Sequence, residues 1–111
     1  MIIVTTQDEL DAALLTDISV IEILSPATYL LHLADSGNRF IDVQGVSRVC
    51  VRGYSVIHVS DTSVVCAHDS CEVYAQDESL VYLFDDSRVE VFADATVREY
   101  GNATRAARDA R

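Results

Sequence analysis

The chain has 111 residues, half of them hydrophobic, and carries 18 acidic against 8 basic side chains for a net charge of −10. This length and composition indicate one globular domain and exclude a disordered chain or a collagen-like fibre, and the apolar runs are too short for a transmembrane helix. The acidity disfavours direct binding to nucleic acid, because a phosphate backbone requires a basic protein face.

Residues 1–38 are expected to form a small α/β N-terminal cap. Thr6 followed by Glu9 has the spacing of a capping box, which predicts a helix over about residues 7–15. The apolar face of this helix is expected to carry Leu10, Leu14 and Leu15. Short strands are expected on either side of the helix and of Pro26, at residues 2–5, 18–24 and 28–33.

Residues 39–101 repeat every eight positions. From Ser47 the octads are SRVCVRGY, SVIHVSDT, SVVCAHDS, CEVYAQDE, SLVYLFDD, SRVEVFAD and ATVREYGN. The first position is small, the third is Val or Ile throughout, and the seventh is mostly Gly or Asp, which suits a turn. Alternating positions face one side of a strand, and one octad cannot bury its apolar side alone. The repeat therefore predicts a mostly β fold, a β-solenoid of stacked octads.

Two octads per coil are favoured over a three-sided prism, because Ser, Val and Ala side chains fill only a narrow interior. This coil predicts that Cys50 lies beside Cys66, Arg52 beside His68, and Glu72 beside Arg88. The competing fold is a meander or sandwich of hairpins, which is typified by irregular strand lengths and mixed turns.

Residues 102–111 are expected to close the last coil as a C-terminal helical cap or tail. The octad frame is broken there, because Glu99 and Arg105 fall at interior positions. Asn102 is expected to cap a short helix over ATRAARDA.

The octads, with Ser or Ala first, Val third and Ala or Val fifth, resemble a group of small octapeptide-repeat proteins of actinobacteria and their phages. VVCAHDS, EVYAQDE and ATVREYGNA carry the likeness, together with the helical segment TTQDELDAALL, over about residues 1–104. The resemblance implies the solenoid fold and assigns no functional residue. The chain departs from the group's pattern in its bulkier outward residues Tyr82, Phe84 and Phe92.

Two cysteines and a histidine form a weak candidate metal site, Cys50, Cys66 and His68. Two thiolates and an imidazole are three of the four ligands that zinc prefers. The spacing matches no common zinc motif and no fourth ligand is evident, so we expect no metal and no cofactor. The alternative is that these are thiols on a strand surface or at an interface.

Five aromatic residues fall at outward positions where a solvated sheet usually has polar side chains. They are the predicted dimer interface: Tyr74, Tyr82, Phe84, Phe92 and Tyr100. We expect a second copy of the chain to cover them about a two-fold axis, as in most oligomers. A distinct partner protein, or a few harmless exposed rings, are the other interpretations.

Acidic residues gather at the predicted turns, and these are the predicted partner-binding positions: Asp61, Asp69, Asp77, Glu78, Asp85, Asp86 and Asp94. Two columns of such charge would imitate a nucleic-acid backbone and fit a basic groove on another protein. The alternative is that Asp is present as a good turn residue and that its charge is a by-product.

The sequence contains no phosphate-binding Gly-rich loop and no nucleophile with a base, so we expect a protein that is not an enzyme. The odd number of cysteines and the absence of a signal-peptide pattern predict a cytoplasmic protein, in the host cytoplasm if a phage encodes it. The leading hypothesis is an interaction protein, such as an anti-CRISPR or DNA-mimic inhibitor, that blocks a nucleic-acid-binding protein with a basic surface. It is expected to be a homodimer that binds neither nucleic acid nor membrane. The alternative is a structural subunit that self-assembles into polymers through open sheet edges.

Overall fold

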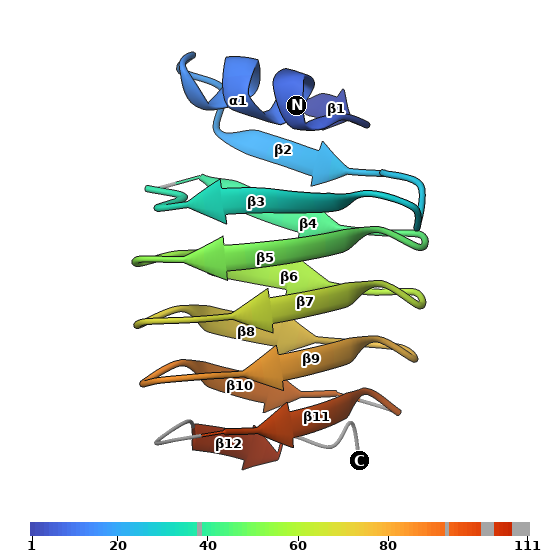
Figure 1. Cartoon of the computed structure of the whole chain (residues 1–111), viewed down its shortest axis with the longest axis vertical. Coiled ribbons are helices and arrows are strands. Elements are labelled where there is room, and N and C mark those ends of the chain that lie inside the picture. Colours follow the sequence, from blue (N-terminus) through green and yellow to red (C-terminus); the bar gives the residue numbers. More distant parts are fainter. Residues whose placement is uncertain (38, 93, 101–103, 108–111) are drawn as a thin grey trace.

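The computed structural model describes residues 1–37, 39–92, 94–100 and 104–107, the last range by its backbone alone. Within these residues the chain forms a β-solenoid of about six turns with one short helix at the N-terminal end (Figure 1). This confirms the predicted solenoid. In the same part of the chain, no helix is long and apolar enough to cross a membrane.

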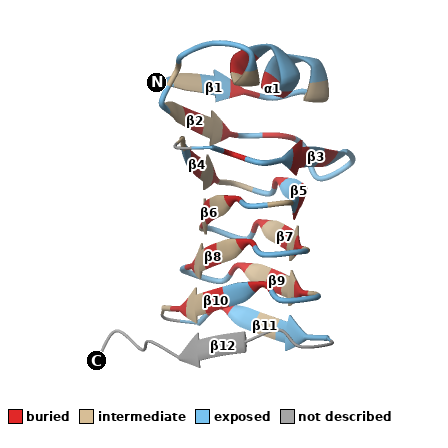
Figure 2. Ribbon diagram, turned by 90° about the vertical axis from the view of Figure 1, so that its left-hand side faces the viewer, coloured by how far each residue is buried: buried red, intermediate tan, exposed pale blue. Residues whose placement is uncertain are grey.

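The strands form two parallel sheets, and the chain alternates between them from β2 onward, one strand in each sheet per turn (Figure 2). The order in sheet A is β1 (Ile2–Val4), β2 (Val20–Ile23), β4 (Phe40–Val43), β6 (Val56–Val59), β8 (Glu72–Ala75), β10 (Arg88–Val91) and β12 (Thr104–Ala107). The order in sheet B is β3 (Leu30–Ala34), β5 (Arg48–Arg52), β7 (Val64–Ala67), β9 (Leu80–Leu83) and β11 (Thr96–Glu99).

The register between neighbouring strands is constant beyond the first turn. Cys50 pairs with Cys66, and Glu72 pairs with Arg88, so partners are 16 residues apart. The Nη2 atom of Arg88 also donates a hydrogen bond of 2.7 Å to Oε1 of Glu72. The first turn is longer, because Ile21 pairs with Ile41 and Leu31 with Val49.

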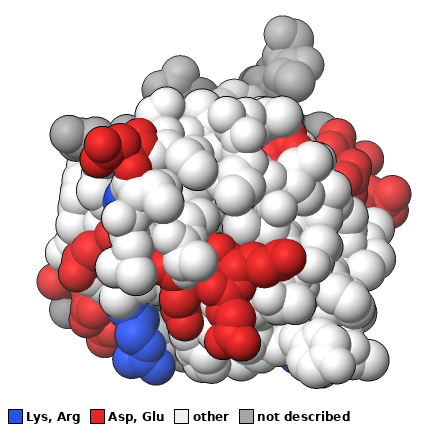
Figure 3. Space-filling model, turned by 90° about the horizontal axis from the view of Figure 1, so that it is seen from above, with Lys and Arg blue, Asp and Glu red and all other residues white. Residues whose placement is uncertain are grey.

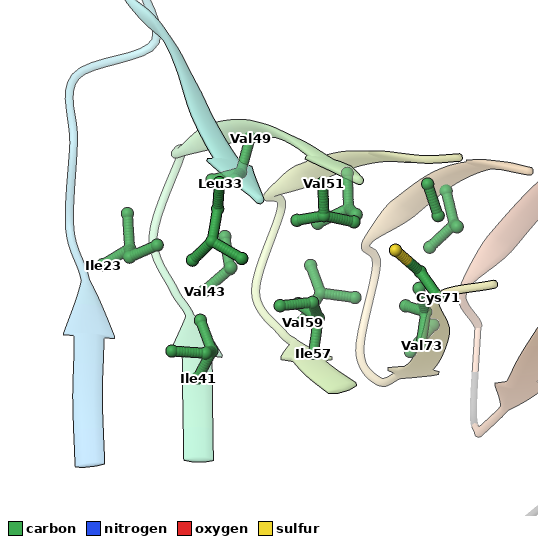
Figure 4. Close-up of a cluster of buried hydrophobic side chains, with 14 of the residues drawn as sticks. Ile23, Leu33, Ile41, Val43, Val49, Val51, Ile57, Val59, Cys71 and Val73 are labelled. Atoms are coloured by element: carbon green, nitrogen blue, oxygen red, sulfur yellow. The ribbon is translucent and has the colours of Figure 1, made fainter. Parts of the chain in front are cut away.

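The two sheets enclose a narrow apolar interior (Figure 4). Ile and Leu side chains are common in its first turns, whereas Val and Ala, as at Val65 and Ala67, prevail in the later ones, where Leu83 is the buried Leu. β-branched residues suit this role because they pack well on a pleated surface. Alternating side chains point outward, which gives each strand its pattern of buried and partly exposed positions.

Serines are buried where the chain enters β5, β6, β7, β9 and β10, and their hydroxyls bond to the backbone of the turns. Ser79 Oγ donates to Gln76 O at 2.7 Å, and Ser87 Oγ donates to Phe84 O at 2.6 Å. Cys71 takes the equivalent place, with its Sγ 3.5 Å from Gly53 O. A small side chain that satisfies a turn carbonyl therefore explains the Ser at this position.

Helix α1 (Gln7–Leu14) lies across the N-terminal end of the solenoid. Thr6 Oγ1 accepts a hydrogen bond of 3.1 Å from the Glu9 amide, as a capping box requires. The helix buries Leu10, but Leu15, expected on the same apolar face, is 88% exposed. This expectation is wrong because the helix ends at Leu14, and a residue five positions after Leu10 does not share its stripe.

A side chain of this helix occupies the free edge of β3, the first strand of sheet B. The Gln7 amide oxygen accepts a hydrogen bond of 2.7 Å from the His32 amide, and Gln7 Nε2 donates one of 2.9 Å to the His32 carbonyl. These two bonds replace a neighbouring strand on β3, the edge of sheet B. A further strand is therefore blocked at this point.

The expected C-terminal helix is wrong for the residues that the structure describes. Residues 104–107 form strand β12, which pairs in parallel with β10, and Val89 is the partner of Arg105. The edge of β10 offers backbone donors and acceptors to any following segment, whatever its side chains. An isolated helix of this length is marginal by comparison. Asn102, its expected cap, lies outside the described residues.

Candidate protein-binding surfaces

Four aspartates occupy equivalent turn positions with left-handed backbone conformation. Asp61, Asp69, Asp77 and Asp85 have φ of 57–58°. Gly45 and Gly53 hold the same place in the preceding turns, with φ of 70° and 69°. Asp tolerates this conformation better than most residues, because its short side chain can bond to nearby backbone.

Each of these aspartates bonds to the turn above it. Asp61 Oδ2 accepts a hydrogen bond of 2.8 Å from the Gly45 amide, and Asp77 Oδ2 accepts one of 3.1 Å from the Asp61 amide. On the opposite side, Asp69 Oδ2 bonds to the Gly53 amide at 3.0 Å, and Asp85 Oδ2 to the Asp69 amide at 3.1 Å. The carboxylates thus form two ladders that hold successive turns in register.

The ladders run along the two edges of the solenoid. The Asp61 edge comprises the turns that leave sheet A, with Asp61, Asp77, Glu78 and Asp94. The Asp69 edge comprises the turns that leave sheet B, with Asp69, Asp85 and Asp86. All seven residues are exposed, so the structure divides the predicted acidic positions between two opposite edges.

The two sheet faces carry opposite charge at their outward strand positions. Among the residues whose side chains the structure describes, sheet A presents Glu22, Asp42, Glu72 and Glu90 with a single arginine, Arg88. Sheet B presents Arg48, Arg52 and Arg98. Among the described residues the one carboxylate on a strand of sheet B is Glu99, at the register position of buried Leu83. Seen from the N-terminal end, acidic side chains outnumber basic ones on the visible surface (Figure 3).

The five aromatic residues predicted to form one interface do not lie together. Tyr74 is on β8, and Phe92 directly follows β10, so both belong to the side of sheet A. Tyr82, Phe84 and Tyr100 are on or directly after strands of sheet B. They separate because successive octads contribute to opposite sheets.

Each sheet instead carries a column of stacked rings that includes histidines. On sheet A, His58 stacks on Phe40 with ring centroids 4.3 Å apart and on Tyr74 at 4.9 Å. On sheet B, Phe84 stacks on His68 at 4.6 Å and on Tyr100 at 4.9 Å. Sequence reasoning missed Phe40 and both histidines as members of these columns, although the 16-residue spacing of His58 and Tyr74 was a usable signal.

The surroundings of His58 shift its pKa. Partial burial between the two rings lowers the pKa of His58, and the nearby Asp42 carboxylate acts in the opposite direction. A hollow of about 320 Å³ beside it is lined by Arg39, Phe40, Tyr54 and His58, among others. Arg39 is held in place there, since its guanidinium donates to the carbonyls of Leu14, Thr16 and Ile18 near the end of α1.

The candidate metal ligands are close in register but do not form a metal site. Cys50 and Cys66 pair across β5 and β7, and burial together with Cys50 raises the pKa of the Cys66 thiol. His68 stacks on Phe84, and its Nδ1 lies 3.8 Å from Oδ2 of Asp85. Across the described ranges, no three His, Cys, Asp or Glu residues are grouped to hold a metal ion.

No family model, curated protein or solved structure matches this chain. The function is therefore argued from the charge and geometry of these surfaces.

Proposed function

We propose that this protein is a non-enzymatic, acidic binding protein whose two aspartate edges engage the basic surface of a nucleic-acid-binding protein, as a DNA-mimic inhibitor does. In this proposal each coil is two octads, and the seventh position of every octad reaches one edge. The observation that carries the proposal is the pair of exposed carboxylate ladders at Asp61–Asp77 and Asp69–Asp85.

The spacing of the charges supports this proposal. Parallel strands are about 4.8 Å apart, so each turn advances the ladder by that distance. Two carboxylates lie in the turn of Asp77 and Glu78, and two more lie in the turn of Asp85 and Asp86. One DNA strand carries one charge per about 3.4 Å. The last turns therefore carry charge along each edge at a density similar to that of a DNA strand.

The rigidity of the ladders also supports it. Each turn aspartate has one carboxylate oxygen bonded to a backbone amide, so its charge is held in a fixed position rather than on a mobile side chain. A fixed charge loses less conformational entropy when a partner binds. The partner chemistry that fits is a groove lined by Arg and Lys, which pair with carboxylates as they do with phosphates.

The N-terminal end disfavours an axial polymer. Gln7 occupies the backbone of His32 on edge strand β3, and α1 lies over the first turn. Stacking of a second solenoid onto this end would have to break these bonds.

The test compares two variants of equal net charge. In the edge variant, Asp61, Asp69, Asp77 and Asp85 are changed to Asn, which keeps an oxygen acceptor at each turn. In the control variant, Asp8→Asn, Asp11→Asn, Asp17→Asn and Glu99→Gln remove four charges elsewhere. Wild-type protein, edge variant and control are immobilised and exposed to an actinobacterial lysate, and bound proteins are eluted with duplex DNA.

We expect wild-type protein and the control to retain DNA-eluted proteins that the edge variant does not retain. The purified target should then lose its DNA binding when wild-type protein is added. Equal capture by the edge variant, or a captured protein that still binds DNA in the presence of the chain, would contradict the proposal.

A further inference from the structure

The two sheet faces are complementary to each other and not to themselves. The sheet A face has Glu22, Asp42, Glu72 and Glu90, of which Glu72 is paired with Arg88 on the same face, whereas the sheet B face has Arg48, Arg52 and Arg98. Placing two sheet A faces together would bring carboxylates against carboxylates, and two sheet B faces would bring arginines against arginines. Like charges in contact disfavour both arrangements.

Apolar side chains accompany these charges on both faces. Sheet A presents Phe40, Val56 and Tyr74 outward, and sheet B presents Leu30, Val64, Leu80 and Tyr82. Most of these are only partly buried by their own chain. A pairing of unlike faces would bury both apolar sets while joining opposite charges at their margins.

We propose that the sheet B face of one copy binds the sheet A face of a second copy, so that solenoids associate side by side. The coil geometry supports this pairing. Asp42 on β4 and the two arginines of β5 belong to successive strands, so they lie at the same height on opposite faces. Two copies with aligned axes therefore bring Asp42 of one to the level of Arg48 and Arg52 of the other.

This interface differs in kind from a two-fold dimer. Its two surfaces are different, so each copy keeps one unused face and association can continue to a third copy. A face five strands wide gives roughly 300 Å² of flat contact per copy. An interface of this size is at the weak end of protein interfaces, so association should depend on concentration and fall with salt.

The test uses one variant for each face and sedimentation velocity as the readout. The sheet B variant carries Arg48→Glu and Arg52→Glu, and the sheet A variant carries Glu22→Arg and Asp42→Arg. We expect wild-type protein to form larger species as its concentration rises, and each variant alone to associate about tenfold more weakly or not at all.

Mixing the two variants provides the decisive comparison. The sheet B variant retains a normal sheet A face, and the sheet A variant retains a normal sheet B face. The mixture should therefore form a mixed complex with equal amounts of the two variants, and this complex can grow as wild type does, because the two reversed faces also carry opposite charges. Formation of that complex also shows that both variants are folded.

Three outcomes would overturn the proposal. One is wild-type protein that stays monomeric up to millimolar concentration in low salt. Another is a single variant that self-associates as wild type does, which indicates a like-face dimer. The third is a mixture of variants that remains monomeric while wild-type protein associates. None of these changes touches the aspartates of the two edges. A negative result here therefore does not contradict the proposed binding of a basic partner. Likewise, a negative result in the partner-binding test does not contradict this association.

Discussion

The first and last turns of this solenoid reach the same backbone geometry with different chemistry. Gly45 and Gly53 provide the left-handed turn residue in two early turns, whereas Asp69 and Asp85 provide it in later turns, with φ values within 13° of one another. Asp35, with φ of 54°, shows that aspartate also serves in an early turn. The interiors differ as well, since the columns that begin with Leu33 and Ile23 continue to the small residues Ala67 and Ala75.

This difference separates the backbone conformation that the turns require from the side-chain charge that can vary. The octad turns from Gly45 to Asp85 share a positive φ, and glycine adopts it without charge. Aspartate adopts it as well and adds a carboxylate that bonds to the turn above. The exposed apolar residues show the opposite trend, since nine of the ten large ones in the described part of the chain lie within residues 1–54. Glycine and aspartate share this backbone conformation, so turn geometry alone does not require the carboxylates of the later turns.

The largest expected effect is in the interior of the first turns. Leu33→Ala removes a side chain that is 2% exposed and leaves a cavity in a tightly packed space. We expect a loss of about 2–5 kcal/mol in the free energy of unfolding, measured by urea denaturation. Leu15→Ala, at a position 88% exposed, is the control and should change it by less than about 0.5 kcal/mol. Similar losses for both would mean that the interior is not packed as described.

A smaller effect should separate the glycine turns from the aspartate turns. Gly53→Ala places a methyl group against the Asp35 carboxylate at a φ of 69°, which should cost about 1–3 kcal/mol. Asp69→Gly keeps the backbone geometry and loses only the hydrogen bond to the Gly53 amide, at about 0.5–1.5 kcal/mol. Both are measured by thermal and urea unfolding. A larger loss for Asp69→Gly would reverse the order that the turn geometry implies.

The smallest effect concerns pH and the ring column of sheet A. Burial lowers the pKa of His58 in the folded protein, so the unfolded chain binds more protons below about pH 6.5. The free energy of unfolding should therefore keep its full value above that pH, and it should fall as the pH drops through the pKa of His58 in the folded state. Unfolding of wild-type protein and His58→Phe across this range provides the measurement. The variant should lack this part of the pH slope, and an unchanged slope would assign it to other groups.

The β-solenoid was predictable because a Val or Ile in every octad, with a small residue two positions before it, permits a narrow stacked interior. The helix over residues 7–14 was predictable from the local capping signal at Thr6. The closure of β3 by Gln7 was not, because it joins residues 25 positions apart through a side-chain amide. Strand β12 was not predictable either, because its pairing with β10 depends on backbone groups rather than on its side chains.

The surfaces were predictable only in part. The turn aspartates were identified from their position in the octad, but their bonds to the preceding turn depend on side-chain geometry that the sequence does not contain. The aromatic residues were identified as outward, yet Tyr74 and Tyr82 lie on opposite sheets. Assigning each octad to a sheet before grouping its residues would have separated them, and would also have shown the opposite charges of the two faces.

The central claim is that the fold uses the oxygen of each turn aspartate but not its charge, which leaves the charge available for a partner. The most direct test is the free energy of unfolding of the edge variant, with Asp61, Asp69, Asp77 and Asp85 changed to Asn. Asn tolerates the same φ and retains an acceptor, and it relieves repulsion between stacked carboxylates. We expect stability within about 1 kcal/mol of wild type, or higher. A loss of several kcal/mol would contradict the account, because it would show that the turns themselves require the charge.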